Sequence, residues 1–230
     1  MKCLDVDVWS DIACPWCYVG KRRLESARAS FAHPERVRVR WRAFELDPAA
    51  PRSAGEMGPY AERLAKKYGM SRAEGEKRLR HLTELAAIEG LELRFDRIRP
   101  TNTFDAHRLV ALARTRGVED LAQERLMRAY FTDGLAVADP GVLAGLGDEM
   151  GLDRNDVHDV LASDAYSGEV RRDEDRARQL GISGVPFFML GQHLAVSGAQ
   201  PSSTLAAALE EAWTDPPGAA PPEGLTPSTH

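Results

Sequence analysis

The chain has few cysteines, no long hydrophobic segment and no excess of positive charge, and each absence excludes a class of protein. Only 3 of its 230 residues are cysteine, too few for a disulfide-stapled scaffold or for the two cysteine pairs of many closed zinc sites. No apolar segment approaches the ~20 residues that cross a membrane. A net charge of −5 at pH 7 gives no footprint for nucleic acid. We therefore expect neither nucleic acid nor membrane as a partner.

The first residues also lack the apolar core of a secretory signal peptide, because Lys2 and Asp5 interrupt them. This predicts a cytoplasmic protein, in a compartment that keeps thiols reduced. With 43% hydrophobic residues, the chain can bury a sizeable core. These properties fit a compact enzyme better than a binding module. The sequence leaves open whether it is a monomer or a homodimer.

The most informative segment is Cys14-Pro15-Trp16-Cys17, where two residues separate two thiols. Residues 4–9 alternate in polarity as a strand does, and residues 18–28 resemble a helix. Cys14 is therefore predicted at or near a helix N-cap and Pro15 at the first helical position, where a missing N–H costs nothing. Redox chemistry is favoured for this pair, because a cytoplasmic CxxC is more often catalytic than structural. A half zinc site or two unreactive structural cysteines are the alternatives.

The predicted position of Cys14 has a chemical consequence. The unpaired N–H groups of a helix N-terminus stabilise a thiolate, and thiols in such motifs titrate at roughly 3.5–7.5 instead of ~8.5. We expect Cys14 to attack the substrate disulfide. Cys17, one turn into the helix, is expected to resolve the mixed disulfide that forms. Pro15 and Trp16 carry no charge, so the motif lacks the extra thiolate stabilisation of a histidine there, which argues against an extreme oxidant.

Cys3 and the histidines are not expected to form a site. A strand at ~3.3 Å per residue places Cys3 roughly 20 Å or more from Cys14, outside disulfide reach. We expect Cys3 to be an ordinary buried strand cysteine. Five of the histidines show no ligand-like spacing with carboxylates or cysteines, so no metal centre is predicted.

Periodicity along the rest of the chain predicts an α/β protein with a long helical block. A second strand, near an edge of the sheet, is expected over 37–44, where arginines alternate with apolar residues. Helices are expected over 59–69, 72–89, 103–116, 119–132, 140–150, 154–162 and 165–180. A hairpin over 185–197 and a helix over 201–213 follow. The proline-rich tail, 214–230, is predicted to be disordered.

Three segments in order, SDIACPWCYVG (10–20), PTNTFDAHR (100–108) and GISGVPFF (181–188), resemble the FrnE-like branch of the DsbA family. The resemblance covers roughly residues 4–213. It implies a thioredoxin-like fold with a large inserted all-helical domain. The thioredoxin-like domain would then comprise residues 1–47 (strand, CxxC, helix, strand) and 165–213 (helix, cis-proline, hairpin, helix). The inserted domain would span residues 48–164.

The same resemblance assigns roles around the CxxC. It implies that the Val185–Pro186 bond is cis and faces the motif, leaving the backbone of Val185 free to pair with a bound peptide or thiol. Allowing one gap, Asp7 matches the buried acid beneath the active site of related folds and would accept the Cys17 proton. A half-exposed strand carboxylate is the alternative.

Asn102 and His107 lie in the second of these segments. We expect them to line a groove facing Cys14 and to bind substrate. His107 is equally compatible with a surface or interhelical histidine.

Taken together, the residues and the resemblance predict a thiol-disulfide oxidoreductase that exchanges disulfides with protein or small-molecule thiols through Cys14 and Cys17. No bound cofactor is expected, and glutathione is a candidate reductant. The first alternative is a glutathione-dependent transferase or isomerase of the kappa or hydroxychromene-carboxylate isomerase type. Those enzymes share the fold but have a serine where Cys14 stands. The second alternative is a non-catalytic chaperone or binding protein.

Overall fold

The computed structural model describes residues 2–52 and 59–214. The chain forms two compact units: the first comprises Met1–Leu46 and Ser167–His230, and the second comprises Asp47–Tyr166. The sequence-based boundaries fall after residues 47 and 164. The first unit contains the sheet, and the second is helical.

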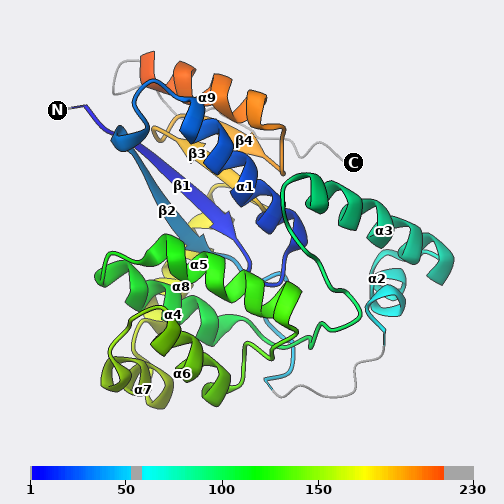
Figure 1. Cartoon of the computed structure of the whole chain (residues 1–230). Helices are drawn as coiled ribbons and strands as arrows, with labels where there is room; N and C mark the ends of the chain where they lie inside the picture. The colour runs from blue at the N-terminus through cyan, green and yellow to red at the C-terminus, as the bar shows by residue number, and fades with distance from the viewer. Residues whose placement is uncertain (1, 53–58, 215–230) are drawn as a thin grey trace. The chain divides into compact units, whose positions relative to one another are not determined.

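The first unit is built on a sheet of four strands in the order β2-β1-β3-β4 (Figure 1). Its strands are β1 (Leu4–Ser10), β2 (Val37–Ala43), β3 (Phe187–Leu190) and β4 (Leu194–Ser197). β1 pairs in parallel with β2 and antiparallel with β3, which in turn pairs antiparallel with β4. A parallel pair needs a crossover connection, and helix α1 (Pro15–Ser30) supplies it.

Helices cover both faces of this sheet. On one face, α1 and α9 (Ser202–Thr214) lie side by side (Figure 1), and Lys21 of α1 lies over the Trp41 ring of β2. On the other face, the Trp9 indole N–H donates to the Asp173 carbonyl of α8 (Ser167–Gln179) at 2.9 Å. Trp9 also belongs to a buried apolar cluster with Ala177, Ile182, Phe187 and Met189. The sheet is thus a layer between helices, and its period-2 pattern separates the two cores.

The predicted strand patterns are confirmed. In β2, Val37 and Trp41 are buried while Arg38 and Arg40 are exposed, and β2 lies at the edge of the sheet. The expected hairpin is β3–β4. Two expectations need correction or qualification. Cys3 is exposed, because it precedes the first strand residue instead of lying within the strand. Of the predicted tail, residue 214 ends α9, and 215–230 lie outside the described residues.

The second unit contains the expected series of helices. These are α2 (Tyr60–Tyr68), α3 (Arg72–Ile88), α4 (Phe104–Thr115), α5 (Glu119–Arg128), α6 (Pro140–Glu149) and α7 (Arg154–Ala162). Ser71 and Glu74 form the predicted capping box, and Asp139 caps α6. The helix expected over 119–132 differs, because α5 ends at Arg128 and a π-helical turn follows. That turn stops at Gly134, whose φ of 70° favours glycine.

α4 is the most buried helix of this unit among those described, and Arg108 joins it to the end of α7. The Arg108 guanidinium is 4% exposed. It pairs with Asp105 at 2.8 Å and donates to the carbonyl oxygens of Val160, Ser163 and Ala165. Arg108 therefore satisfies backbone acceptors where α7 ends, which a helix cannot do by itself.

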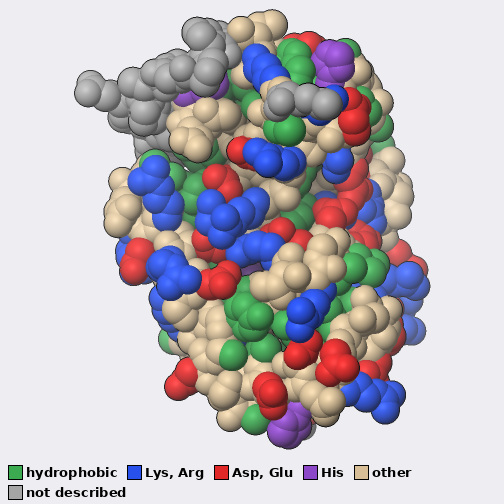
Figure 2. All heavy atoms as spheres, turned by 90° about the vertical axis from the view of Figure 1, so that its left-hand side faces the viewer, with side chains coloured by type: hydrophobic (Ala, Val, Ile, Leu, Met, Phe, Trp, Pro, Cys, Tyr) green, Lys and Arg blue, Asp and Glu red, His purple; other side chains and the backbone are tan. Residues whose placement is uncertain are grey.

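The surface shows mixed charge on the face drawn in Figure 2, where lysine and arginine side chains are interspersed with aspartates and glutamates. Within residues 2–52 and 59–214, no helix has both the length and the apolar composition to cross a bilayer.

Candidate active site

The CxxC motif lies where β1 leads into α1. The amide of Cys14 donates to the Asp11 carbonyl at 3.1 Å, which closes a turn after the strand. Cys14 is the N-cap of α1 and Pro15 its first residue, as expected. The Cys14 side chain makes no capping hydrogen bond. Its thiol is thus left to interact elsewhere.

That thiol faces the carbonyl oxygen of Val185, at a sulfur–oxygen distance of 3.6 Å. The Val185–Pro186 peptide bond is cis, as the resemblance implied. The backbone of α1 packs tightly on this segment, because a Cβ added at Gly20 would lie 2.9 Å from Pro186 Cγ. The fold therefore brings Cys14 together with Val185 and Pro186.

Both thiols of the motif are free and buried: Cys14 is 4% exposed and Cys17 is 1% exposed. Trp16 between them is 40% exposed. Burial raises the pKa of Cys17 well above its usual value, and a hydrogen bond and charge repulsion from Cys14 raise it further. Hydrogen bonds from the Asp11 backbone and the Ser10 side chain act in the opposite direction. Cys17 therefore stays protonated at neutral pH.

Asp7 lies on the α8 side of the sheet. It shares a face of β1 with Trp9, and its carboxylate pairs with Arg42 at 2.8 Å. Its side chain is 23% exposed. The Arg42 pair favours the alternative of a half-buried strand carboxylate. Proton transfer from Cys17 to Asp7 remains a prediction.

Asp11, next to the motif, is a buried carboxylate that was not among the predicted site residues. Asp11 is 2% exposed, and its Oδ1 accepts from the Ala13 amide at 3.2 Å. Its Oδ2 accepts from the Leu46 amide at 2.8 Å. A signal for the first contact was present, because aspartate often bonds to the amide two residues ahead in a turn. The second contact links segments that no local pattern connects.

Asn102 and His107 belong to the second unit. The Asn102 carbonyl accepts from the Phe104 amide at 2.9 Å, and its amide group donates to the Pro48 carbonyl at 3.3 Å. His107, on α4, is 4% exposed, so it is not a surface histidine. A role of either residue in substrate binding remains a prediction.

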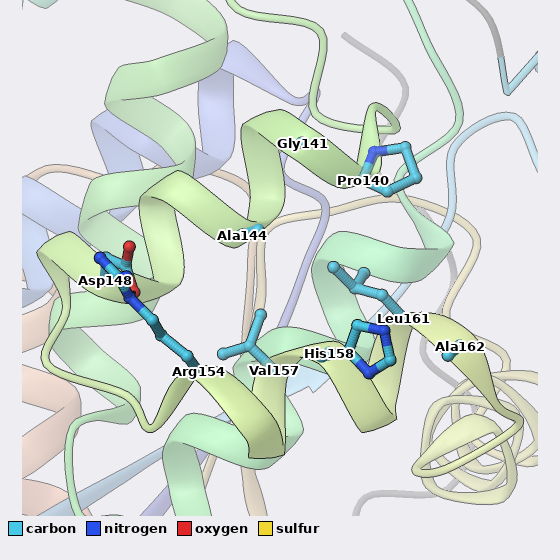
Figure 3. Close-up of a pocket in the computed structure, with 9 residues that line it drawn as sticks. All are labelled: Pro140, Gly141, Ala144, Asp148, Arg154, Val157, His158, Leu161 and Ala162. Carbon is cyan, nitrogen blue, oxygen red and sulfur yellow. The ribbon is translucent and has the colours of Figure 1, made fainter.

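The second unit also has a cavity of about 580 Å³ between α6 and α7 (Figure 3). Ala144, Val157 and Leu161 line it, and an ion pair of Asp148 and Arg154 at 2.9 Å lies at one end. No cysteine is among its described lining residues. Nor do the described residues include three or more His, Cys, Asp or Glu side chains arranged to hold a metal.

Comparison with solved structures gives consistent matches. A probable DsbA oxidoreductase from Streptomyces coelicolor is 43% identical, with 97% of this chain and 94% of that chain covered and a TM-score of 0.86. A 2-hydroxychromene-2-carboxylate isomerase, 19% identical, shares the fold over 90% of this chain and 95% of its own, with a TM-score of 0.70. The cytosolic disulfide reductase DsbM from Pseudomonas aeruginosa, solved with glutathione, is 20% identical. It shares the fold over 90% of this chain and 98% of its own, with a TM-score of 0.61.

The family comparison agrees with the geometry. The model of the DsbA-like thioredoxin domain matches residues 5–210, which include the CxxC, the cis-proline and the hairpin. With a thioredoxin-like sheet, an N-terminal CxxC helix and this match, the chain belongs to the DsbA-like thioredoxin domain family.

Proposed function

We propose that this protein is a cytoplasmic thiol-disulfide oxidoreductase of the FrnE-like branch, which acts on protein or small-molecule thiols through Cys14 and Cys17. One observation carries the proposal: two free thiols share the first turn of α1, and the first faces the Val185 carbonyl at 3.6 Å. Membership of the DsbA-like family supports it.

In the reduced enzyme, the Cys14 thiolate attacks one sulfur of a substrate disulfide. The substrate S–S bond breaks, one substrate thiolate leaves and takes up a proton, and a mixed disulfide forms on Cys14. Cys17 then loses its proton and attacks Cys14 Sγ, which releases the second substrate thiol and closes the Cys14–Cys17 disulfide. Two electrons pass from the enzyme to the substrate.

The reverse sequence oxidises a substrate. A substrate thiolate attacks Cys14 of the oxidised enzyme, and a second substrate thiol resolves the mixed disulfide, leaving both cysteines reduced. Glutathione is a suitable reductant for the oxidised pair, and no bound cofactor is required. The direction depends on the reduction potential relative to the surrounding thiol pool.

The electrostatics of the pair support this division of labour. Because the pKa of Cys17 is raised by burial and by Cys14, Cys17 holds its proton while Cys14 attacks. The thiolate is the nucleophilic form. Cys17 therefore competes little for the first step and acts in the second.

The alternative is a glutathione-dependent transferase or isomerase. The shared fold of the chromene-carboxylate isomerase favours considering it. A thiol at residue 14, where that class is expected to have serine, favours exchange instead. In a Cys14→Ser variant, exchange would be lost, whereas a site that only activates glutathione would retain activity.

The decisive experiment is a glutathione redox titration in a Cys3→Ser background, because exposed Cys3 would otherwise form its own adducts. Thiol alkylation with mass analysis reports the pair, and Trp16 fluorescence is a second probe. A reversible two-electron transition is expected. A potential above about −200 mV would indicate an oxidant or isomerase, and one near −270 mV a reductase. A glutathione adduct on Cys14 without an internal disulfide would overturn the proposal in favour of transfer or isomerisation.

A chaperone or binding role makes a different prediction. A Cys14→Ser, Cys17→Ser double variant would retain full activity in suppressing aggregation if the protein acted without its thiols. Loss of all activity toward thiol substrates in that variant, with an unchanged circular dichroism spectrum, is the result we expect.

A further inference from the structure

Asp11 is a buried carboxylate that the exchange steps above do not use. Burying a charge is unfavourable unless it is hydrogen-bonded, and here two backbone amides supply the bonds. Ala13 donates to Oδ1 at 3.2 Å and Leu46 donates to Oδ2 at 2.8 Å. Hydrogen bonds to an ionised acceptor are stronger than neutral ones. The carboxylate thus joins two separate segments of the first unit.

The first segment is the turn that presents Cys14. Asp11 begins this turn and accepts two hydrogen bonds within it. Its Oδ1 accepts from the Ala13 amide, and its carbonyl oxygen accepts from the Cys14 amide at 3.1 Å. Ile12, inside the turn, is fully buried. Because the Cys14 thiol provides no cap for α1, the position of the Cys14 backbone depends on this turn.

The second segment follows β2. The last ladder bond between β1 and β2 runs from the Phe44 amide to the Ser10 carbonyl at 3.2 Å. In a parallel ladder, the next donor, Leu46, would pair with the carbonyl of Ile12. The chain instead turns at Asp11, and the Asp11 carboxylate accepts from Leu46 in its place. A side chain therefore extends the pairing of the two strands beyond the point where the backbone leaves it.

The same turn reaches the second thiol. The backbone of Asp11 and the hydroxyl of Ser10 hydrogen-bond to Cys17 and favour its thiolate form, against burial and the neighbouring Cys14. A shift of this turn would therefore alter both cysteines together.

We propose that Asp11 is a positioning residue of the redox motif, whose carboxylate anchors the Asp11–Cys14 turn to the segment after β2 and so holds both thiols in their reactive arrangement. This inference rests on the proposed function for its redox readout. The expected change in Cys14 alkylation does not depend on the proposed function.

The test compares Asp11→Ala and Asp11→Asn in the full-length Cys3→Ser protein. The asparagine amide keeps one acceptor for the turn but loses the charge and one of the two acceptors. Asp5→Ala is the matched control on β1, where Asp5 is exposed and pairs with Arg38. Asp139→Ala is the stability control, because it removes a capping aspartate in the second unit.

Three quantities are measured: the glutathione equilibrium constant, the rate of Cys14 alkylation by iodoacetamide at pH 7, and thermal unfolding by circular dichroism. In Asp11→Ala the turn loses its anchor, so both thiols leave the arrangement that it holds. We therefore expect alkylation of Cys14 to slow by about tenfold and the equilibrium to shift toward the disulfide by about tenfold, a size set by the loss of hydrogen bonds to a charged group. Asp11→Asn is expected to lie between wild type and Asp11→Ala. In both controls, the equilibrium constant and the alkylation rate should stay within about twofold of the wild-type values. Asp139→Ala should nevertheless unfold at a lower temperature.

Each other outcome is informative. Faster alkylation in both Asp11 variants would mean that the carboxylate only repels the thiolate, and would overturn the positioning role. Unchanged values, or equal changes in Asp139→Ala, would overturn it as well. If wild type forms no disulfide, the proposed function fails and the alkylation rates alone decide this inference. If Asp11→Ala does not fold, Asp11→Asn decides by the same criteria.

Discussion

The thiol of Cys14 donates a hydrogen bond to the carbonyl oxygen of Val185, 171 residues further along the chain, at 3.6 Å. The Cys14 sulfur thus already contacts a backbone acceptor on the segment that precedes β3. A substrate strand or a thiol bound beside Cys14 would compete for the same carbonyl. The packing that holds the two segments together is therefore a direct target for mutation.

Gly20→Ala should disturb this packing. The added methyl would lie 2.9 Å from Pro186 Cγ and 3.3 Å from Phe188 Cζ, and overpacking of this kind typically costs about 1–3 kcal/mol. We expect lower stability in chemical denaturation and altered Cys14 alkylation. Gly145→Ala in α6 is the control, since nothing lies within 4 Å of its added methyl, and it should gain roughly 0.5–1 kcal/mol. Wild-type stability of Gly20→Ala would show that the proline segment moves aside freely.

Resolution of the mixed disulfide should accelerate with pH. Burial raises the pKa of Cys17, so only a small fraction is thiolate at neutral pH. Below its pKa that fraction rises ~10-fold per pH unit. The starting species is the protein with glutathione bound to Cys14 as a mixed disulfide. Mass analysis of quenched samples between pH 6 and 8 measures the rate of glutathione release, which should show this slope. Cys17→Ser should retain the adduct throughout. A pH-independent rate in wild type would contradict a raised pKa.

Glu174 should make the first unit less stable as pH rises. Burial raises the pKa of its carboxyl, the ion pair with Arg171 opposes this, and the neighbouring Glu45 raises it further. Because the folded pKa exceeds the unfolded value, the folded state binds more protons. The stabilisation that comes from this difference in the Glu174 pKa is complete below about pH 4. It is lost as the pH rises through the folded pKa.

Glu174→Gln removes that titration. We expect the free energy of unfolding of wild type, relative to the variant, to fall between pH 4 and 7 in urea denaturation. The exposed Glu210→Gln change on α9 is the control and should leave the pH profile as in wild type. A parallel profile for wild type and Glu174→Gln would refute the prediction.

Arg108→Ala should destabilise the second unit strongly. It removes the donor to three carbonyls near the end of α7 and the buried partner of Asp105, which keeps its ion pair with the exposed Arg52 at 3.0 Å. Breaking a buried pair costs up to about 3–5 kcal/mol, and the three carbonyls also lose their donor. Arg154→Ala, which removes an exposed ion pair with Asp148, should change little. Denaturant unfolding measures both, and equal effects would argue against the role of Arg108.

Some parts of the fold were predictable because their causes are local. The alternation of Val37, Trp41 and Ala43 with arginines identified β2 and its buried face, since successive side chains in a strand point to opposite sides. Ser71 with Glu74 located the start of α3. The π-helical turn after α5 was not foreseen, because the amphipathic pattern continues through it while the backbone widens.

The candidate site divides in the same way. The sequence by itself determined that Cys14 occupies the N-cap position of a helix after a strand, that Pro15 begins the helix and that Cys17 follows within one turn, because strand period, proline position and helix signals act over a few residues. The resemblance implied that the Val185–Pro186 bond faces the motif, and in the structure the Val185 carbonyl accepts from the Cys14 thiol. Only the tertiary structure decided that Asp7 pairs with Arg42 and that the Leu46 amide donates to Asp11. These partners depend on strand register and helix packing, which join residues far apart in the chain and leave no trace in local periodicity.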